Sequence, residues 1–270
     1  MPKLYSDDNY IFEIEEDPVL SVRNLHVKID ELSILKGVDL DVADGESLVI
    51  LGGSGTGKSV LLKSILGLIP KQRGTVTING VDIDNVTKDE REKVLSRVGM
   101  LFQGGALFDS LTIWENIAFG LIHGQGMDPG AAQKIAFDVM QQVDLERRTA
   151  FLHPDSLSGG MRKRVGLARA LASKPKIIFF DEPTTGLDPI TSNIVNGLIV
   201  RTVKCSEIGA ITITHDLDSL RQIADRVAFL FDGKIIWTGS VQGMDNTENP
   251  YIRQFIDAKT TGPLTDRNAR

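Results

Sequence analysis

The stretch GGSGTGKS, residues 52–59, matches the pattern G-x-x-x-x-G-K-[S/T]. It follows the apolar run SLVIL and precedes a segment, Lys58 to Leu68, whose apolar residues recur at helical spacing. Glycines in such a loop let backbone N–H groups curl around phosphate groups at the positive end of the helix. The stretch therefore predicts a nucleotide site between a strand and a helix of an α/β fold.

The last two residues of this loop have the most specific predicted roles in nucleotide binding. Lys58 reaches the β- and γ-phosphates of a nucleoside triphosphate, and the hydroxyl of Ser59 is a ligand for Mg²⁺. The expected nucleotide contacts of the whole loop are Gly52, Gly53, Ser54, Gly55, Thr56, Gly57, Lys58 and Ser59.

Polar side chains follow other apolar runs downstream of the loop. Asp181 and Glu182 come directly after the run IIFF, Gln103 closes VGMLFQ, and His215 follows AITIT. Parallel strands end at the edge where α/β folds bind ligands, so these side chains are expected to converge on the γ-phosphate. Asp181 and Gln103 are candidate Mg²⁺ ligands, while Glu182 is placed to polarise the attacking water, with Gln103 and His215 as further catalytic residues.

The pattern of apolar residues predicts the architecture around this site. Apolar strands that alternate with helices indicate a mainly parallel sheet covered on both faces. The runs of residues 19–42 alternate with period 2, and Asn79-Gly80 lies between two further alternating runs, which predicts a hairpin. We therefore predict an α/β P-loop NTPase (RecA-like) with a mainly parallel sheet, an N-terminal antiparallel β subdomain and an inserted helical subdomain.

The same pattern divides the chain into four parts. Residues 1–18 form a polar N-terminal extension, and residues 104–165 lose the strand pattern and form the helical subdomain. The ATPase-like core then comprises residues 19–103 and 166–240, followed by a C-terminal tail of residues 241–270.

The stretch LSGGM, residues 157–161, opens a second predicted helix with small residues. Ser158, Gly159 and Gly160 offer a hydroxyl and backbone N–H groups to an anion at a helix N-terminus. The basic residues that follow on this helix are expected to form a solvated face, with contact of one of them to phosphate as the alternative: Arg162, Lys163, Arg164 and Arg169.

In order, the chain carries GGSGTGKS, Gln103, LSGGM, IIFFDEP, the stretch GLD and His215. This order of motifs resembles that of the ATP-binding-cassette (ABC) ATPases over residues 19–240. The resemblance implies an ATP hydrolase that works as a homodimer, its two copies facing head to tail. Ser158, Gly159 and Gly160 of one copy then bind the γ-phosphate of ATP held by the other, and Asp188 lies at the same interface.

One position departs from the family pattern. ABC ATPases usually stack the adenine ring on an aromatic residue near position 29, whereas this chain has Val27, Lys28 and Ile29 there. Two alternatives stay open. Either an aliphatic side chain supports the base, or an aromatic residue of the N-terminal extension folds over it.

Composition excludes several other classes of protein. The chain has 270 residues, a formal net charge of −6 and one cysteine, so it forms no intrachain disulfide, and bulk electrostatics disfavour nucleic-acid binding. It lacks a signal-peptide pattern and any apolar run of the ~18 residues that span a bilayer. We therefore expect it to be cytoplasmic unless a partner holds it at a membrane.

The combination FQGGALFDSLTIWENIAF, LSGGMRKRVGLARAL and FDEPTTGLDPIT is similar to the Mla-type subfamily. Those ATPases drive phospholipid traffic between inner and outer membranes. The resemblance implies a multipass permease, an MCE-domain lipid-binding protein and a small STAS-domain protein as partners, with this chain peripheral at the cytoplasmic face of the inner membrane. It also implies that residues after Gln103 receive the permease, with Phe108 a candidate exposed contact and its apolar neighbours core.

Two other functions compete with this one. Another transport cargo needs only a different permease. A soluble ABC ATPase acting on DNA or ribosomes is disfavoured, because the chain has one cassette and no heptad run between Lys58 and Ser158.

The tail carries its own pattern. Ile252, Phe255 and Ile256 form an apolar stripe at helical spacing, which needs a partner surface. The stripe packs either against the chain's own core or against the second copy.

Overall fold

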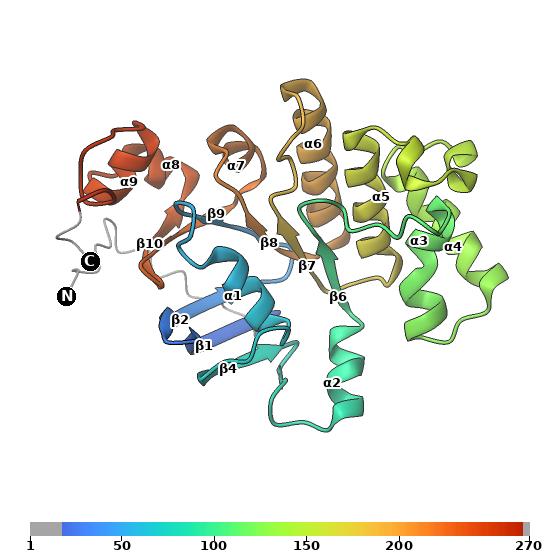
Figure 1. Cartoon of the computed structure of the whole chain (residues 1–270), viewed down its shortest axis with the longest axis horizontal. Coiled ribbons are helices and arrows are strands. Elements are labelled where there is room, and N and C mark those ends of the chain that lie inside the picture. The colour runs from blue at the N-terminus through green and yellow to red at the C-terminus, as the bar shows by residue number, and fades with distance from the viewer. Residues whose placement is uncertain (1–17, 267–270) are drawn as a thin grey trace.

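The computed structural model describes residues 18–266 and contains two sheets with helices around them (Figure 1). Predictions that concern Tyr5, Tyr10 and Phe12 of the N-terminal extension fall outside the described residues. The structure confirms the predicted α/β class with a mainly parallel sheet, because one sheet is parallel except for one edge strand and the other is antiparallel.

The central sheet has strand order β10-β9-β3-β8-β7-β6. Its strands β3, β7 and β8 read as continuous apolar runs because both of their faces are covered. The strands are β3 (Ser47–Leu51), β6 (Val98–Leu101), β7 (Ile177–Asp181), β8 (Gly209–Ile213), β9 (Arg226–Phe231) and β10 (Lys234–Ser240).

The smaller sheet is the predicted N-terminal antiparallel subdomain, in the order β2-β1-β4-β5. The Asn79-Gly80 hairpin joins its last two strands, with both residues at positive φ as a tight turn requires. Its strands are β1 (Leu20–Ile29), β2 (Leu32–Val42), β4 (Arg73–Ile78) and β5 (Val81–Asp82).

Helices cover both faces of the central sheet and form the block at the right of Figure 1. The α-helices are α1 (Lys58–Ile65), α2 (Lys88–Leu95), α3 (Ile113–Phe119), α4 (Pro129–Gln142), α5 (Gly159–Ala172), α6 (Pro189–Ser206), α7 (Leu217–Ile223), α8 (Val241–Asn246) and α9 (Pro250–Ile256). Shorter turns are η1 (Gly120–Gly124, a π-helix) and the 3₁₀-helices η2 (Arg147–Phe151) and η3 (Pro154–Ser156). None of the helices within residues 18–266 combines the length and apolarity that a membrane span needs.

Two details differ from the sequence prediction. Helix α1 ends at Ile65 rather than Leu68, because Gly67 turns the chain with a φ of 70°. Helix α5 runs unbroken through the predicted boundary at residues 165 and 166, so the chain passes from the helical block into the core within one helix.

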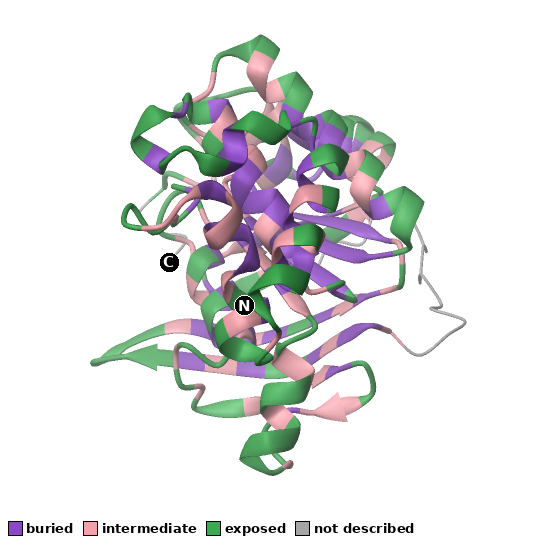
Figure 2. Ribbon diagram, turned by 90° about the vertical axis from the view of Figure 1, so that its right-hand side faces the viewer, coloured by how far each residue is buried: buried purple, intermediate pink, exposed green. Residues whose placement is uncertain are grey.

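Successive residues of the central strands feed two apolar clusters, one on each face, and Figure 2 shows the buried strands between the layers. Val49 and Phe180 pack with the helical block on one face, while Ile50 and Phe179 pack with the antiparallel sheet and α1 on the other. The helical block therefore shares a continuous core with the central sheet, which fixes its position relative to the strand ends.

The tail packs on its own chain. Ile252 of α9 is fully buried, and the Phe255 ring meets Phe229 of β9 edge to face with 5.6 Å between centroids. Of the two alternatives for the apolar stripe, these contacts match packing on the chain's own core.

Candidate active site

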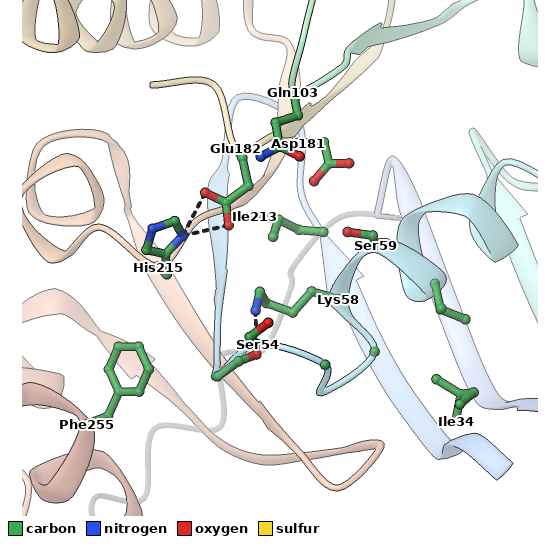
Figure 3. A pocket seen from close by; sticks show the side chains of 14 residues that line it. Ile34, Ser54, Lys58, Ser59, Gln103, Asp181, Glu182, Ile213, His215 and Phe255 are labelled. Carbon is green, nitrogen blue, oxygen red and sulfur yellow. Dashed lines mark hydrogen bonds and ion pairs between the residues drawn. The ribbon is translucent and has the colours of Figure 1, made fainter. Parts of the chain in front are cut away.

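A pocket of about 720 Å³ opens where the phosphate loop meets the carboxyl ends of β6, β7 and β8. Figure 3 shows its side chains converging from these elements. The lining residues are Ile34, Gly53, Ser54, Gly55, Gly57, Lys58, Ser59, Val60, Gln103, Asp181, Glu182, Ile213, His215 and Phe255.

The loop adopts the shape that its glycines were expected to allow. A side chain at Gly52 would collide with the carbonyl of Leu230, and Gly57 caps α1 with a φ of 102° that favours glycine. Gly52 and Thr56 shape the loop without lining the pocket, and the Thr56 hydroxyl donates to the carbonyl of Gly53 at 2.9 Å. Because no side chain caps α1, its first-turn N–H groups face the loop as donors for an anion.

Lys58 lies at the centre of the pocket. Its Nζ donates to the carbonyls of Gly52 and Gly53, each at 2.7 Å. Burial lowers the pKa of Lys58, while the carboxylates of Glu182 and Asp181 act in the opposite direction. The ammonium group of Lys58 therefore lies over the loop, where phosphate oxygens bind in sites of this kind.

Asp181 ends strand β7 and faces α1. Burial, and then the neighbouring Glu182, raise the pKa of Asp181, while Lys63, the hydroxyl of Ser59 and Lys163 oppose the rise. A half-buried carboxylate next to a hydroxyl and a second carboxylate is an environment that a bound cation stabilises. The pair Ser59 and Asp181 therefore fits Mg²⁺, which binds through few protein oxygens and takes waters and phosphates as its other ligands.

Glu182 follows Asp181 with a φ of 51°, a left-handed conformation that is unusual for a residue with a side chain. Its backbone N–H donates to the carbonyl of Ile213 at 2.9 Å, and the Thr185 hydroxyl donates to its carboxylate at 2.7 Å. The carboxylate also pairs with Nδ1 of His215 at 2.8 Å. Glu182 is 14% exposed and His215 62% exposed at the side chain, so the pair spans the pocket from floor to mouth.

The structure places the predicted site residues in two groups, as expected from a site shared between copies. Gln103 is exposed and lines the pocket with Asp181 and Glu182, as expected. Ser158, Gly159, Gly160 and Asp188 do not line it; they lie at the N-termini of α5 and α6.

These two helix ends form one surface. Ser158 caps α5 by accepting from the N–H of Met161 at 3.3 Å, and Asp188 caps α6 by accepting from the N–H groups of Ile190 and Thr191 at 3.0 Å. The backbone of Gly160 lies so close to Thr191 that a side chain there would collide with it. We call the exposed residues of this surface the signature face: Ser158, Gly159, Asp188, Ile190 and Ile194.

Four pocket residues were not expected from the sequence. Val60 directly follows the predicted Ser59, and Ile213 lies two residues before the predicted His215, whereas the other two are distant from every predicted site residue in the chain. Ile34 of β2 lines the pocket beside Gly57, and Phe255 of α9 lines the opposite side (Figure 3). A single apolar residue in a strand or helix pattern carries no signal that distinguishes a pocket wall from ordinary core. Only the contact between segments far apart in the chain reveals them.

The expectation of a solvated basic face on α5 is wrong for two of its residues. Lys163 is only 5% exposed and donates to the carbonyl of Gln103 and, at 3.1 Å, to that of Glu182. Arg169 donates to the carbonyls of Gly105 and Ala106 at 2.8 and 2.7 Å. Because the helix packs against the loop after β6, these two side chains donate hydrogen bonds to backbone carbonyls instead of to water.

A second pocket, also of about 720 Å³, lies between α2, β6 and the helical block. Its lining includes Phe102, Phe108, Phe119 and Arg169. Phe108 is 43% exposed, as predicted. Of the neighbours expected in the core, Ile113 is buried and Leu107 and Trp114 pack partly buried against the core, whereas Leu111 is half-buried and belongs to neither apolar cluster.

Comparison with known proteins agrees with this geometry. The family model of the ABC transporter matches residues 35–185. The intermembrane phospholipid transport system ATP-binding protein MlaF of Haemophilus influenzae is 34% identical over 91% of this chain and 93% of its own. The probable ribonucleotide transport ATP-binding protein mkl of Mycobacterium leprae is 35% identical over 91% of this chain and 70% of its own.

Among solved structures, the ATP-binding cassette MJ0796, dimeric and in a post-hydrolysis state with ADP and Pi, superposes with a TM-score of 0.74. It is 31% identical to this chain and covers 82% of it and 98% of its own length. The phosphate loop, the strand-end carboxylates and these matches together show that the chain belongs to the ABC transporter family and is one of its ATP-binding ATPases.

Proposed function

We propose that this chain is the ATP-hydrolysing motor subunit of a membrane transporter for phospholipids. The observation that carries the hydrolytic part is the position of Glu182. Its carboxylate lines the pocket with Lys58, and its backbone has a left-handed conformation from which the side chain reaches His215.

Glu182 accepts the proton of the attacking water as the water oxygen bonds to the γ-phosphorus. The bond from that phosphorus to the β–γ bridging oxygen breaks, and ADP leaves with the bridging oxygen. A carboxylate held by hydrogen bonds needs little reorganisation when charge develops, which lowers the barrier. The pairing with His215 fixes the carboxylate orientation from the pocket mouth. Gln103, at the end of the neighbouring strand, orients the water from the other side.

Ser59, Asp181 and Gln103 would hold Mg²⁺. When bound, the ion neutralises charge on the β- and γ-phosphates and fixes their geometry. Lys58 and the N–H groups of the loop bind the same phosphates from below, so the chain's own residues position ATP for in-line attack.

A second copy completes the site. The signature face offers a helix N-terminus to an anion, yet its residues line neither of the two pockets described above. Its residues Ile190 and Ile194 are 75% and 48% exposed, an apolar surface that a partner would cover. We infer a head-to-tail dimer in which Ser158, Gly159 and Gly160 meet the γ-phosphate of ATP bound by the other copy and Asp188 borders it.

The adenine ring rests on an aliphatic side chain. Ile34 lines the pocket beside the N-terminus of α1, whereas Ile29 does not line it. An aliphatic contact of this kind binds a base through burial alone and adds little selectivity between purines.

The second pocket receives the permease. Asn116 holds the backbone of Phe108 at both its N–H and its carbonyl, at 2.7 and 3.0 Å, and the ring stacks on Phe119 at 4.4 Å. This arrangement presents an apolar side chain at the rim of a preformed groove, next to the segment that follows Gln103. A permease seated there places the chain at the cytoplasmic face of the inner membrane.

Phospholipid is the cargo that the comparisons support best. MlaF matches over nearly the whole of both chains, whereas mkl, named for ribonucleotide transport, matches over 70% of its own length. An MCE-domain lipid carrier and a STAS-domain protein belong to the same proposal, because the subfamily resemblance implies them.

Affinity purification of the chain from membranes in mild detergent, followed by mass spectrometry of proteins and lipids, tests the proposal. We expect a permease, an MCE-domain protein and bound phospholipid. A permease with another cargo would overturn the phospholipid assignment, and recovery only with ribosomes or DNA would overturn the transporter assignment.

A further inference from the structure

Lys163 is a lysine buried on the second turn of α5. A buried ammonium group is costly unless it is paired, so its presence in the core calls for a reason. Burial lowers the pKa of Lys163, while Glu182 and Asp181 act in the opposite direction. A neutral side chain would fill the same space without that cost.

Lys163 bridges two strand ends that carry the site. Its Nζ donates to the carbonyl of Gln103, after β6, and to the carbonyl of Glu182, after β7. Strands β6 and β7 are parallel neighbours. One ammonium group therefore ties both polar residues of the γ-phosphate edge to a single helix.

The Glu182 backbone needs such a restraint. Its left-handed conformation is unfavourable for a residue with a side chain and persists only where surrounding contacts hold it. The Ile213 carbonyl holds the N–H side of this residue, and Lys163 holds the carbonyl side. With both sides fixed, the side chain leaves the backbone in one direction, toward His215.

The same helix restrains the loop after Gln103 in the same way. Gly105 and Ala106 have φ values of 79° and 47°, and the Arg169 guanidinium holds both of their carbonyls. A side chain at Gly166 would come within 2.5 Å of Leu101, so helix and strand are packed at their closest approach. Helix α5 and the strand ends thus form one rigid unit.

We propose that Lys163 is a positioning residue for ATP hydrolysis, which fixes the Glu182 and Gln103 backbones to the helix that begins with Ser158. Lys163 does not touch the reacting atoms. In the proposed dimer, the N-terminus of α5 meets the γ-phosphate of the ATP that the other copy binds. Lys163 therefore also connects a copy's own ATP pocket with the part of the same copy that completes the other copy's pocket. This role rests on the proposed function of Glu182.

The test is Lys163→Met in the full chain, purified with its co-purifying partners. Methionine keeps the apolar stem and removes the donors. We expect kcat for ATP hydrolysis to fall about 10- to 100-fold, because small displacements of catalytic groups cost that much, while KM for ATP stays within about twofold. Lys163→Arg retains donors and should recover part of the lost kcat.

Arg164→Met is the matched control. Arg164 lies on the same turn of α5 and also donates to a backbone carbonyl, that of Asp144 at 2.9 Å, but away from the pocket. It should keep wild-type kcat. Thermal unfolding of each variant shows whether it folds; if Lys163→Met does not, Lys163→Gln takes its place in the same assay.

A Lys163→Met enzyme with kcat within about twofold of wild type would overturn the proposal. So would equal losses of kcat in Lys163→Met and Arg164→Met, which would point to general helix stability, or a loss confined to KM. Glu182→Gln is measured in parallel. If Glu182→Gln hydrolyses ATP at the wild-type rate, the proposed role of Glu182 is wrong. If Glu182→Gln is inactive and Lys163→Met is not impaired, only the Lys163 proposal is wrong.

Discussion

The phosphate-loop pocket and the signature face both present a helix N-terminus, but they differ in what surrounds it. At the pocket, α1 has a glycine cap, begins with Lys58 and is faced by half-buried carboxylates. At the signature face, α5 and α6 are capped by Ser158 and Asp188 and border exposed isoleucines. The first region is a nearly complete phosphate site, whereas the second is a contact surface that acquires chemistry only against another molecule.

The largest expected effect lies in the pocket. Glu182→Gln should lower the hydrolysis rate by about 100-fold or more, because a general base contributes that much. Binding of ATP should persist, since Lys58 and the loop are untouched. Radiolabelled phosphate release and nucleotide binding measured on the same preparation check both halves, and hydrolysis at the wild-type rate would remove Glu182 from its proposed role.

The signature face should respond next, and only through the second copy. Ser158→Asp keeps a good helix cap but sets a negative charge toward the γ-phosphate, so hydrolysis should fall by about 10-fold or more. Ser158→Asn caps equally well without the charge and is the matched control. Equal activity of the Asp and wild-type proteins would contradict a phosphate at this face.

Mixing variants sharpens the same comparison. Lys58→Ala damages the pocket of one copy, and Ser158→Asp damages the signature face of the other. A mixed dimer retains one composite site with both halves intact, so the mixture should regain part of the activity that each variant lacks alone. If mixing restores nothing, the two regions do not meet across copies.

A smaller effect is expected at the side chain that contacts the adenine ring. Ile34→Ala removes apolar area from the pocket wall and should raise KM for ATP by about threefold to tenfold, with kcat little changed. Steady-state kinetics with ATP and GTP measure this, and Ile29→Ala is the control because Ile29 does not line the pocket. A larger effect at Ile29 would place the adenine ring against strand β1 instead of β2.

The smallest effect concerns the stability that Asp188 gives to its own chain. The Thr191 hydroxyl, and then backbone N–H groups, hold the pKa of Asp188 below its ordinary value of 3.8. A depressed pKa means that this stabilisation is present above 3.8 and is lost as the pH falls through the folded-state value. Urea unfolding should therefore find wild type more stable than Asp188→Asn at neutral pH, with a difference that vanishes in acid. A difference that does not change with pH would contradict the charge-based explanation.

Local chemistry makes much of the site predictable from the sequence. The loop of residues 52–59, the strand-end residues Asp181 and Glu182, and the positions of Gln103 and His215 follow from motifs whose spacing serves one function, and the pocket brings them together. The two sheets also follow from local pattern, because alternation distinguishes a half-buried strand from one that is buried on both faces.

By itself, the sequence determined the phosphate loop, the fold class and the presence of a helix start at Ser158, since each depends on neighbouring residues. The tertiary structure alone decided that Ile34 and Phe255 line the pocket, that α9 packs on β9, and that Lys163 is buried against Gln103 and Glu182. The physical reason is the same throughout. A lysine or an isoleucine has the same local pattern in water, in a core or in a site, and only packing between distant segments decides which of these it meets.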